Sequence, residues 1–126
     1  MDATLIETNK KDATYCYKGF KSYQSLNTWW AEHQVIVHSE FRDGNVPGGF
    51  EQLRVFKEAL ECLPSGVERF RLRSDTAGYQ HELLRYCERG ENERLGKIEF
   101  AIGCDVTSSF MEAVSDVEEG QWKPTK

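Results

Sequence analysis

Asp75 is well placed to do chemistry, because it stands where a predicted strand gives way to a predicted helix. Phe70 and Leu72 supply apolar, strand-forming character, and residues 75–78 (DTAG) form a turn that can start a helix. In open α/β sheets, ligands gather at the carboxyl ends of strands, so a carboxylate here can hold a metal ion. It can equally act as a cap, since a side-chain oxygen of Asp75 or Ser74 that accepts from orphan amides stabilises a helix by about 1 kcal/mol.

Three helices are predicted from apolar residues at helical spacing. The clearest runs from Phe50 to Leu63, the second spans His81 to Cys87 with Gly90 placed to end it, and the third covers residues 108–117. Strands are predicted over residues 2–7, 14–24, 34–41, 67–72 and 97–104, residues 27–33 as a turn or short helix, and residues 120–126 as irregular. The order β-β-β-α-β-α-β-α predicts an α/β layer fold in which a three-strand meander is joined by crossover helices.

Length and composition indicate one domain. The chain has 126 residues, of which 39% are hydrophobic, enough for a modest single core. No apolar run approaches the roughly 20 residues of a membrane span, and no basic region followed by an apolar one opens the chain. We therefore expect a soluble, cytoplasmic protein with no membrane partner.

Cysteines, histidines and net charge limit the chemistry further. The four cysteines form no C-x-x-C pair, so buried, reduced thiols are expected in preference to a zinc site, and the three scattered histidines receive no catalytic role. The formal net charge of -5 argues against strong nonspecific DNA binding by the isolated chain. Locally basic surface is compatible with this charge, because early lysines are balanced by an acidic C-terminal region.

The predicted order β-β-β-α-β-α-β is that of the RNase H-like fold, with a mixed sheet and flanking helices. Nucleases of this fold place carboxylates on the first strand and at the end of the fourth, positions that hold Asp2 and Asp75 here. Two such carboxylates can bind divalent metal ions about 3.5–4 Å apart, which stabilise the attacking and leaving oxygens of a phosphoryl transfer.

Five segments of the sequence resemble the DDE transposases of bacterial insertion sequences, whose catalytic domain is RNase H-like. They are DATLIET (2–8), YKGFKSYQSL (17–26), EFRDGNVPGGF (40–50), LRSDTAGYQHELLRYC (72–87) and IEFAIGCDVT (98–107). The resemblance implies that the family's D-x-T corresponds to Asp2 and Thr4 and its second catalytic aspartate to Asp75. It also implies Mg²⁺ or Mn²⁺ as cofactor and transposon-end DNA as partner.

The sequence departs from that family in one important respect. The third acid, a glutamate on a downstream helix, has no counterpart within these residues. The upstream DNA-end-binding region and the residues leading into the first strand have none either. We therefore expect an internal fragment, residues 1–126, of a transposase catalytic domain that binds metal weakly and does not catalyse transposition alone.

The resemblance also suggests residues that contact DNA. Lys18 and Lys21 on the second strand, and Arg73 just before Asp75, could approach DNA phosphates in an intact enzyme. Solvated strand faces, or ion pairs with the many acidic residues, are the alternative for these side chains.

Two other functions remain open from the sequence. The segment DATLIET also resembles the D-x-D-x-T signature of haloacid-dehalogenase-type phosphatases, but only Met1 precedes Asp2, and a Tyr-rich strand follows where that family has a helix. The stronger alternative is a non-catalytic transposase remnant that acts as a regulatory or dimerisation module, pairing as a homodimer through an exposed sheet edge.

Overall fold

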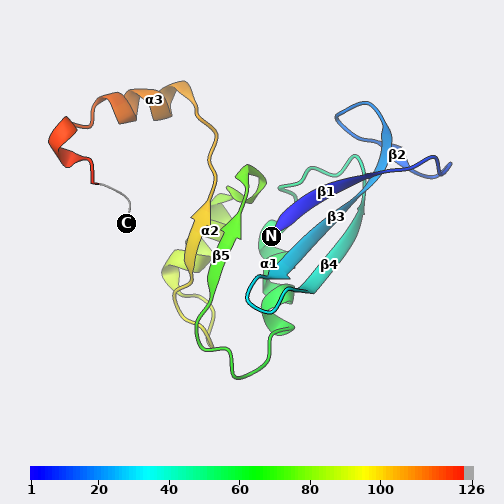
Figure 1. Ribbon diagram of the computed structural model, residues 1–126, viewed down its shortest axis with the longest axis horizontal. Helices are drawn as coiled ribbons and strands as arrows, with labels where there is room; N and C mark the ends of the chain where they lie inside the picture. Colours follow the sequence, from blue (N-terminus) through cyan, green and yellow to red (C-terminus); the bar gives the residue numbers. More distant parts are fainter. Residues whose placement is uncertain (124–126) are drawn as a thin grey trace.

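The computed structural model describes residues 1–123 and shows a mixed α/β protein with antiparallel and parallel strands and three α-helices (Figure 1). Its strands are β1 (Asp2–Glu7), β2 (Thr14–Tyr15), β3 (Lys21–Trp30), β4 (Val35–Asp43), β5 (Arg71–Ser74) and β6 (Glu99–Ile102). Its α-helices are α1 (Gln52–Glu61), α2 (His81–Arg89) and α3 (Ser108–Ser115), with the 3-10 helices η1 (Thr76–Gly78) and η2 (Glu119–Gln121).

The larger sheet is antiparallel and is built around β3. β1 and β4 pair with β3 from opposite sides, and the short β2 pairs with its first residues. In the β1–β3 register, Asp2 faces Asn27 and Glu7 faces Ser22. One face of β3 is buried, with Leu26 fully covered, so the strand separates a packed side of the sheet from an exposed side.

The smaller sheet consists of β5 and β6, which run parallel with Arg71 level with Glu99 and Ser74 level with Ile102. Helix α2 makes the crossover between them, as parallel neighbours require. Gly90 ends α2 in the left-handed conformation (φ 67°), which confirms the predicted stop.

The core lies between helices α1 and α2 and the smaller sheet. Its buried side chains are Phe56, Leu60, Leu63, Leu72, Leu83, Tyr86, Cys87 and Ile98. Helix α1 supplies Phe56 and Leu60, and Leu63 follows just after its end. The helix also packs on β4, so it holds both sheets to one core (Figure 1). Cys16 and Cys87 are buried as predicted, Cys104 is partly exposed, and Cys62 is exposed at the end of α1, where the prediction of a buried thiol was wrong.

The strands depart from the predicted boundaries at three places. Only residues 31–33 of the predicted turn over 27–33 form one, because β3 continues through Trp29 and Trp30, which pair with Ile36 and Val35 of β4. The predicted strand over residues 14–24 is broken by a turn with Gly19 in the left-handed region (φ 84°), and β5 begins only at Arg71. In the tail predicted as irregular, residues 119–121 form η2, and residues 124–126 lie outside the described part of the chain.

The predicted single mixed sheet is divided in two. Among residues 1–123, no strand of the larger sheet pairs with β5 or β6. Backbone contact between them is made at Met1, whose amino group donates to the Arg73 carbonyl (2.8 Å) and whose carbonyl accepts from Ser74 Oγ (3.1 Å). The amino terminus therefore lies between the two sheets (Figure 1).

None of the helices within residues 1–123 is both long enough and apolar enough to cross a membrane.

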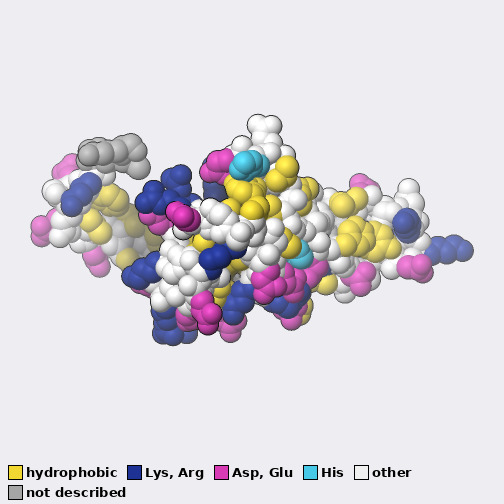
Figure 2. Space-filling view, turned by 90° about the horizontal axis from the view of Figure 1, so that it is seen from below, with side chains coloured by type: hydrophobic (Ala, Val, Ile, Leu, Met, Phe, Trp, Pro, Cys, Tyr) yellow, Lys and Arg dark blue, Asp and Glu magenta, His cyan; other side chains and the backbone are white. Residues whose placement is uncertain are grey.

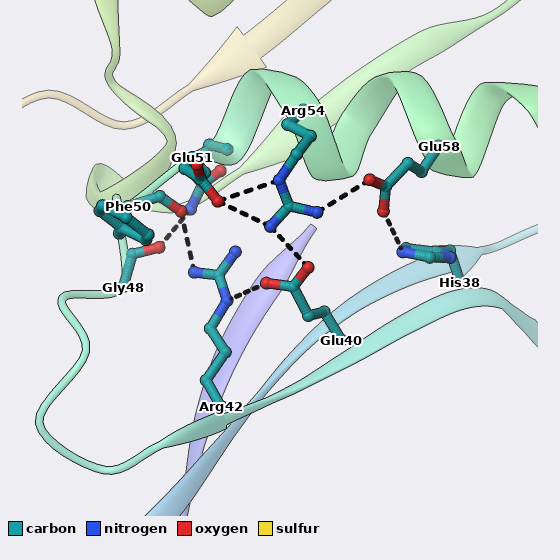
Figure 3. Close-up of polar contacts among 9 residues, drawn as sticks. His38, Glu40, Arg42, Gly48, Phe50, Glu51, Arg54 and Glu58 are labelled. Atoms are coloured by element: carbon teal, nitrogen blue, oxygen red, sulfur yellow. Dashed lines mark hydrogen bonds and ion pairs between the residues drawn. The ribbon is translucent and has the colours of Figure 1, made fainter.

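A polar network joins β4 to α1 (Figure 3). Arg54 lies 2.6 Å from Glu40 and 2.8 Å from both Glu51 and Glu58, and Glu40 also accepts from Arg42 at 2.6 Å. Burial alone would raise the pKa of Glu40, but hydrogen bonds from Arg54 and Arg42 outweigh it and hold that pKa below its ordinary value. The network thus adds charge-assisted contacts between β4 and α1 to the apolar packing of Val37 against the core.

We expect Arg54→Gln to lower the free energy of unfolding by about 1 kcal/mol at pH 7, because the pairs are partly exposed but share one guanidinium. A depressed pKa stabilises the fold above the unfolded-state value and loses that contribution as pH falls through the folded-state value. The difference between wild type and variant should therefore shrink below about pH 4. Urea unfolding at several pH values measures it. A difference in unfolding free energy that stays constant down to pH 3 would contradict this account. The control is Arg85→Gln, on the exposed face of α2.

Candidate functional site

A cleft of about 1200 Å³ between the two sheets brings the predicted acids to one place, since Asp2 and Asp75 both line it. Asp2 is the first residue of β1, and Asp75 directly follows β5. The two strands meet at Met1, so side chains more than seventy residues apart in the sequence share one edge of the cleft.

The local fold orients each carboxylate. Thr4 lies two residues beyond Asp2 on the same face of β1, and its hydroxyl donates to Asp2 Oδ2 (3.2 Å). Asp75 caps η1, with Oδ1 accepting from the Ala77 N–H at 3.1 Å, so the predicted capping role is confirmed. Gly78 permits this tight turn, because a Cβ there would lie 2.6 Å from the Cβ of Ser74.

The Met1 ammonium is near enough to Asp2 and Asp75 for their charges to affect its pKa, although no carboxylate of the described residues lies within ion-pair distance of it. Burial lowers its pKa below that of an ordinary amino terminus, while the negative charges of Asp2 and Asp75 partly offset that shift. The charges of both carboxylates therefore act on one cation. This ammonium lies where β1 meets β5 and donates a hydrogen bond to the Arg73 carbonyl.

The donor set for a metal ion is incomplete. Within residues 1–123, no group of three or more His, Cys, Asp or Glu side chains is arranged to hold a metal ion. Two carboxylates would bind a metal ion more weakly than the three acids of the DDE family, because water would have to supply the remaining ligands. We derive no catalytic step through a metal in this chain.

The three predicted DNA-contacting residues do not lie together. Arg73 lines the cleft beside Asp75. Lys21 begins β3, six residues from the Asn27 that faces Asp2, which places it about 20 Å away along the strand. Lys21 Nζ donates to the Lys11 carbonyl (3.0 Å), and Lys18 lies over the Tyr17 ring in the turn before β3. Only Arg73 of the three thus shares the cleft with the acids.

The cleft itself was not predicted from the sequence. Its walls include Trp29, Trp30 and Phe70. Trp29 is 52% exposed, so it is not core. No local pattern in the sequence signalled it, because the extension of β3 beyond its ladder with β1 appears only in the structure.

Comparisons with protein-family models, with curated proteins and with solved structures find no match to this chain.

Asp75→Ala should lower the free energy of unfolding by about 1 kcal/mol through loss of the cap, whereas Asp75→Asn should leave it nearly unchanged, since Asn caps equally well. Urea unfolding of both variants measures the difference. Asp105→Ala, at an exposed acid elsewhere in the chain, is the control. Equal destabilisation by Ala and Asn would show that the charge of Asp75, and not the cap, contributes the stability.

Proposed function

We propose that this chain is part of the RNase H-like catalytic domain of a DDE transposase. The intact parent would use two divalent metal ions, Mg²⁺ or Mn²⁺, to cleave and join transposon-end DNA. The observation that carries the proposal is that Asp2 and Asp75, the residues that match the family's first two acids, line one cleft and act on one cation. The chain alone is inactive in this proposal, because the third acid has no counterpart in it.

The strand arrangement supports the same proposal. The hydrogen bonds of Met1 place the start of β1 beside the end of β5. If β1 is taken as the neighbour of β5, the strands follow one another across the molecule as β4, β3, β1, β5 and β6, with the first three antiparallel and the last two parallel. In that order the first strand and the strand before α2 are adjacent, which is the arrangement that an RNase H-like acid pair needs.

Charge around the acids fits a role with DNA in the intact parent. Arg69, Arg71 and Arg73 line the same cleft as Asp2 and Asp75, so cations that can contact phosphates flank the carboxylates. Lys18 and Lys21 would contact DNA, if at all, at a separate place about 20 Å along the sheet.

Manganese titration tests the acid pair directly. We expect weak, saturable Mn²⁺ binding by calorimetry that is lost in Asp2→Asn and in Asp75→Asn and kept in Asp105→Asn. The Asn variant at position 75 retains the cap, so loss of binding reports the charge and not the fold. The absence of Mn²⁺ binding, or binding that is indifferent to both substitutions, would contradict the proposed acid pair.

A strand-transfer assay accompanies the titration. With transposon-end DNA and Mg²⁺ or Mn²⁺, the chain should give no product, because removal of one metal ligand from a site that works by positioning costs orders of magnitude in rate. Robust strand transfer would show that the two acids suffice.

A further inference from the structure

The larger sheet is covered by a helix on one face only. Glu40 of β4 pairs with Arg54 of α1 at 2.6 Å, so α1 lies on the face to which Glu40 points. Side chains alternate between the two faces of a strand, so Phe41 points to the opposite face, where it is 64% exposed. Within residues 1–123, Figure 1 shows the larger sheet with α1 on one side and no helix across the other.

Apolar side chains gather at one end of this uncovered face. Tyr23 and Phe41 are in contact there, with ring centroids 4.9 Å apart. Ile6 of β1 lies opposite Tyr23, and Tyr15 of β2 lies one step further along, opposite Lys21. We call Ile6, Tyr15, Tyr23 and Phe41 the aromatic patch, and their exposed side chains present on the order of 300 Å² of apolar surface. Patches of this size on a monomer are often interaction sites. Figure 2 shows hydrophobic side chains at the surface of the end of the molecule where β2 lies.

Helix α3 carries an apolar side that is exposed. Phe110, Val114 and Val117 recur at helical spacing along it, with Met111 beside them. No residue of α3 is buried, and Phe110 and Met111 are 43% and 52% exposed. Thr107 caps the helix by accepting from the Phe110 N–H at 3.2 Å, but its eight residues are too few for a helix to be stable alone in water. Packing of its apolar side against another apolar surface would therefore stabilise α3.

Charge favours the aromatic patch as that surface. Residues 105–123, which include α3, carry five acidic side chains and one basic side chain: Asp105, Glu112, Asp116, Glu118, Glu119 and Lys123. The segments around the patch carry four lysines and three acids: Lys10, Lys11, Lys18, Lys21, Glu7, Asp12 and Asp43. Lys21 stands within the patch, with Nζ 5.9 Å from the centre of the Tyr15 ring. The strongly acidic helix segment is therefore attracted to the more basic end of the sheet.

The connection to α3 leads it away from the patch of its own chain. Gly103 is held at the end of β5, where its N–H donates to the Ser74 carbonyl (3.3 Å). Residues 104–107 span at most about 14 Å. Tyr23 lies three strand spacings across and four residues along β3 from that point, on the order of 20 Å. A return within one chain would stretch the connection across Asp75 and Asp2 and carry Asp105 past both, where like charges repel. Figure 1 shows α3 and β2 at opposite ends of the molecule, so α3 is presented to another molecule.

We propose that α3 of one chain packs on the aromatic patch of a second copy of this chain, in a reciprocal exchange that closes a two-fold dimer. Phe110, Met111 and Val114 contact the rings of Tyr23 and Phe41. Because the dimer makes this contact twice, it buries about 1,200 Å² in total, which reaches the lower range of specific protein interfaces. The inference stands on two exposed apolar surfaces of opposite charge and does not depend on the proposed function.

Cross-linking shows which chain supplies the helix. Asp43→Cys lies beside Tyr23 on the patch and Ala113→Cys lies beside the apolar side of α3, and both replace exposed residues. In a Cys62→Ser, Cys104→Ser background, a mixture of the two single variants treated with a short bismaleimide should give covalent heterodimers. Ala113→Cys mixed with Glu88→Cys, an exposed position on α2, is the control and should give none. If a chain that carries both Asp43→Cys and Ala113→Cys gives a cross-linked monomer, the proposal is overturned in favour of docking within one chain.

Sedimentation equilibrium of the full chain measures the dimer itself. Phe110→Glu should raise the dissociation constant at least about thirtyfold, because each dimer buries this ring twice. Ser109→Glu adds the same charge to the other side of α3 and should change the constant less than about threefold. A chain that stays monomeric at every concentration up to the millimolar range would overturn the proposal. A dimer that Phe110→Glu leaves unchanged would overturn it in favour of another surface, such as a strand edge.

Discussion

The position of Met1 is the constraint on which the relation between the two sheets depends. Its amino group and carbonyl bond to Arg73 and Ser74, while the next residue, Asp2, already belongs to the ladder with β3. One residue thus carries the backbone connection, and the remaining attachment of the smaller sheet is the apolar core beneath α1 and α2. A sheet joined by one residue leaves the edges of β3 and β5 open on the same side, and the cleft follows from that.

The same constraint places a positive charge near the candidate acids. The Met1 amino group is partly buried because it connects the two sheets. It is near Asp2 and Asp75 because these residues lie at the start of β1 and just after β5. A cation bound by both carboxylates would compete with this ammonium. The joint between the sheets and the candidate site are therefore coupled, because the amino group that bonds to Arg73 also carries the charge that acts on Asp2 and Asp75.

Local patterns in the sequence predicted the elements better than their assembly. Helical spacing predicted α1 and α2, Gly90 predicted the end of α2, and Asp75 was recognised as a cap from its place after a strand. Trp29 and Trp30 were missed as strand residues because their partners, Ile36 and Val35, are recognised only once the hairpin is known. The split into two sheets and the cleft depend on contacts across seventy residues, which no local pattern encodes. The packed face of β3 and β4 misleads further, since it carries Ser22, Gln24, Thr28 and Arg42, while Phe41 and Trp29 are exposed.

The two interpretations of Asp75, as a cap and as a metal ligand, are compatible in this geometry. The cap engages Oδ1 through the Ala77 N–H, and the hydroxyl of Thr4 engages Oδ2 of Asp2. An ionised carboxylate has two oxygens and about four acceptor sites, so each acid keeps acceptor capacity after its local hydrogen bond is made. A hydrogen bond that fixes one oxygen also orients the other, which lowers the entropy lost when a ligand is bound. The contact that stabilises the turn after β5 therefore fixes the orientation of the Asp75 carboxylate and leaves it able to accept further hydrogen bonds.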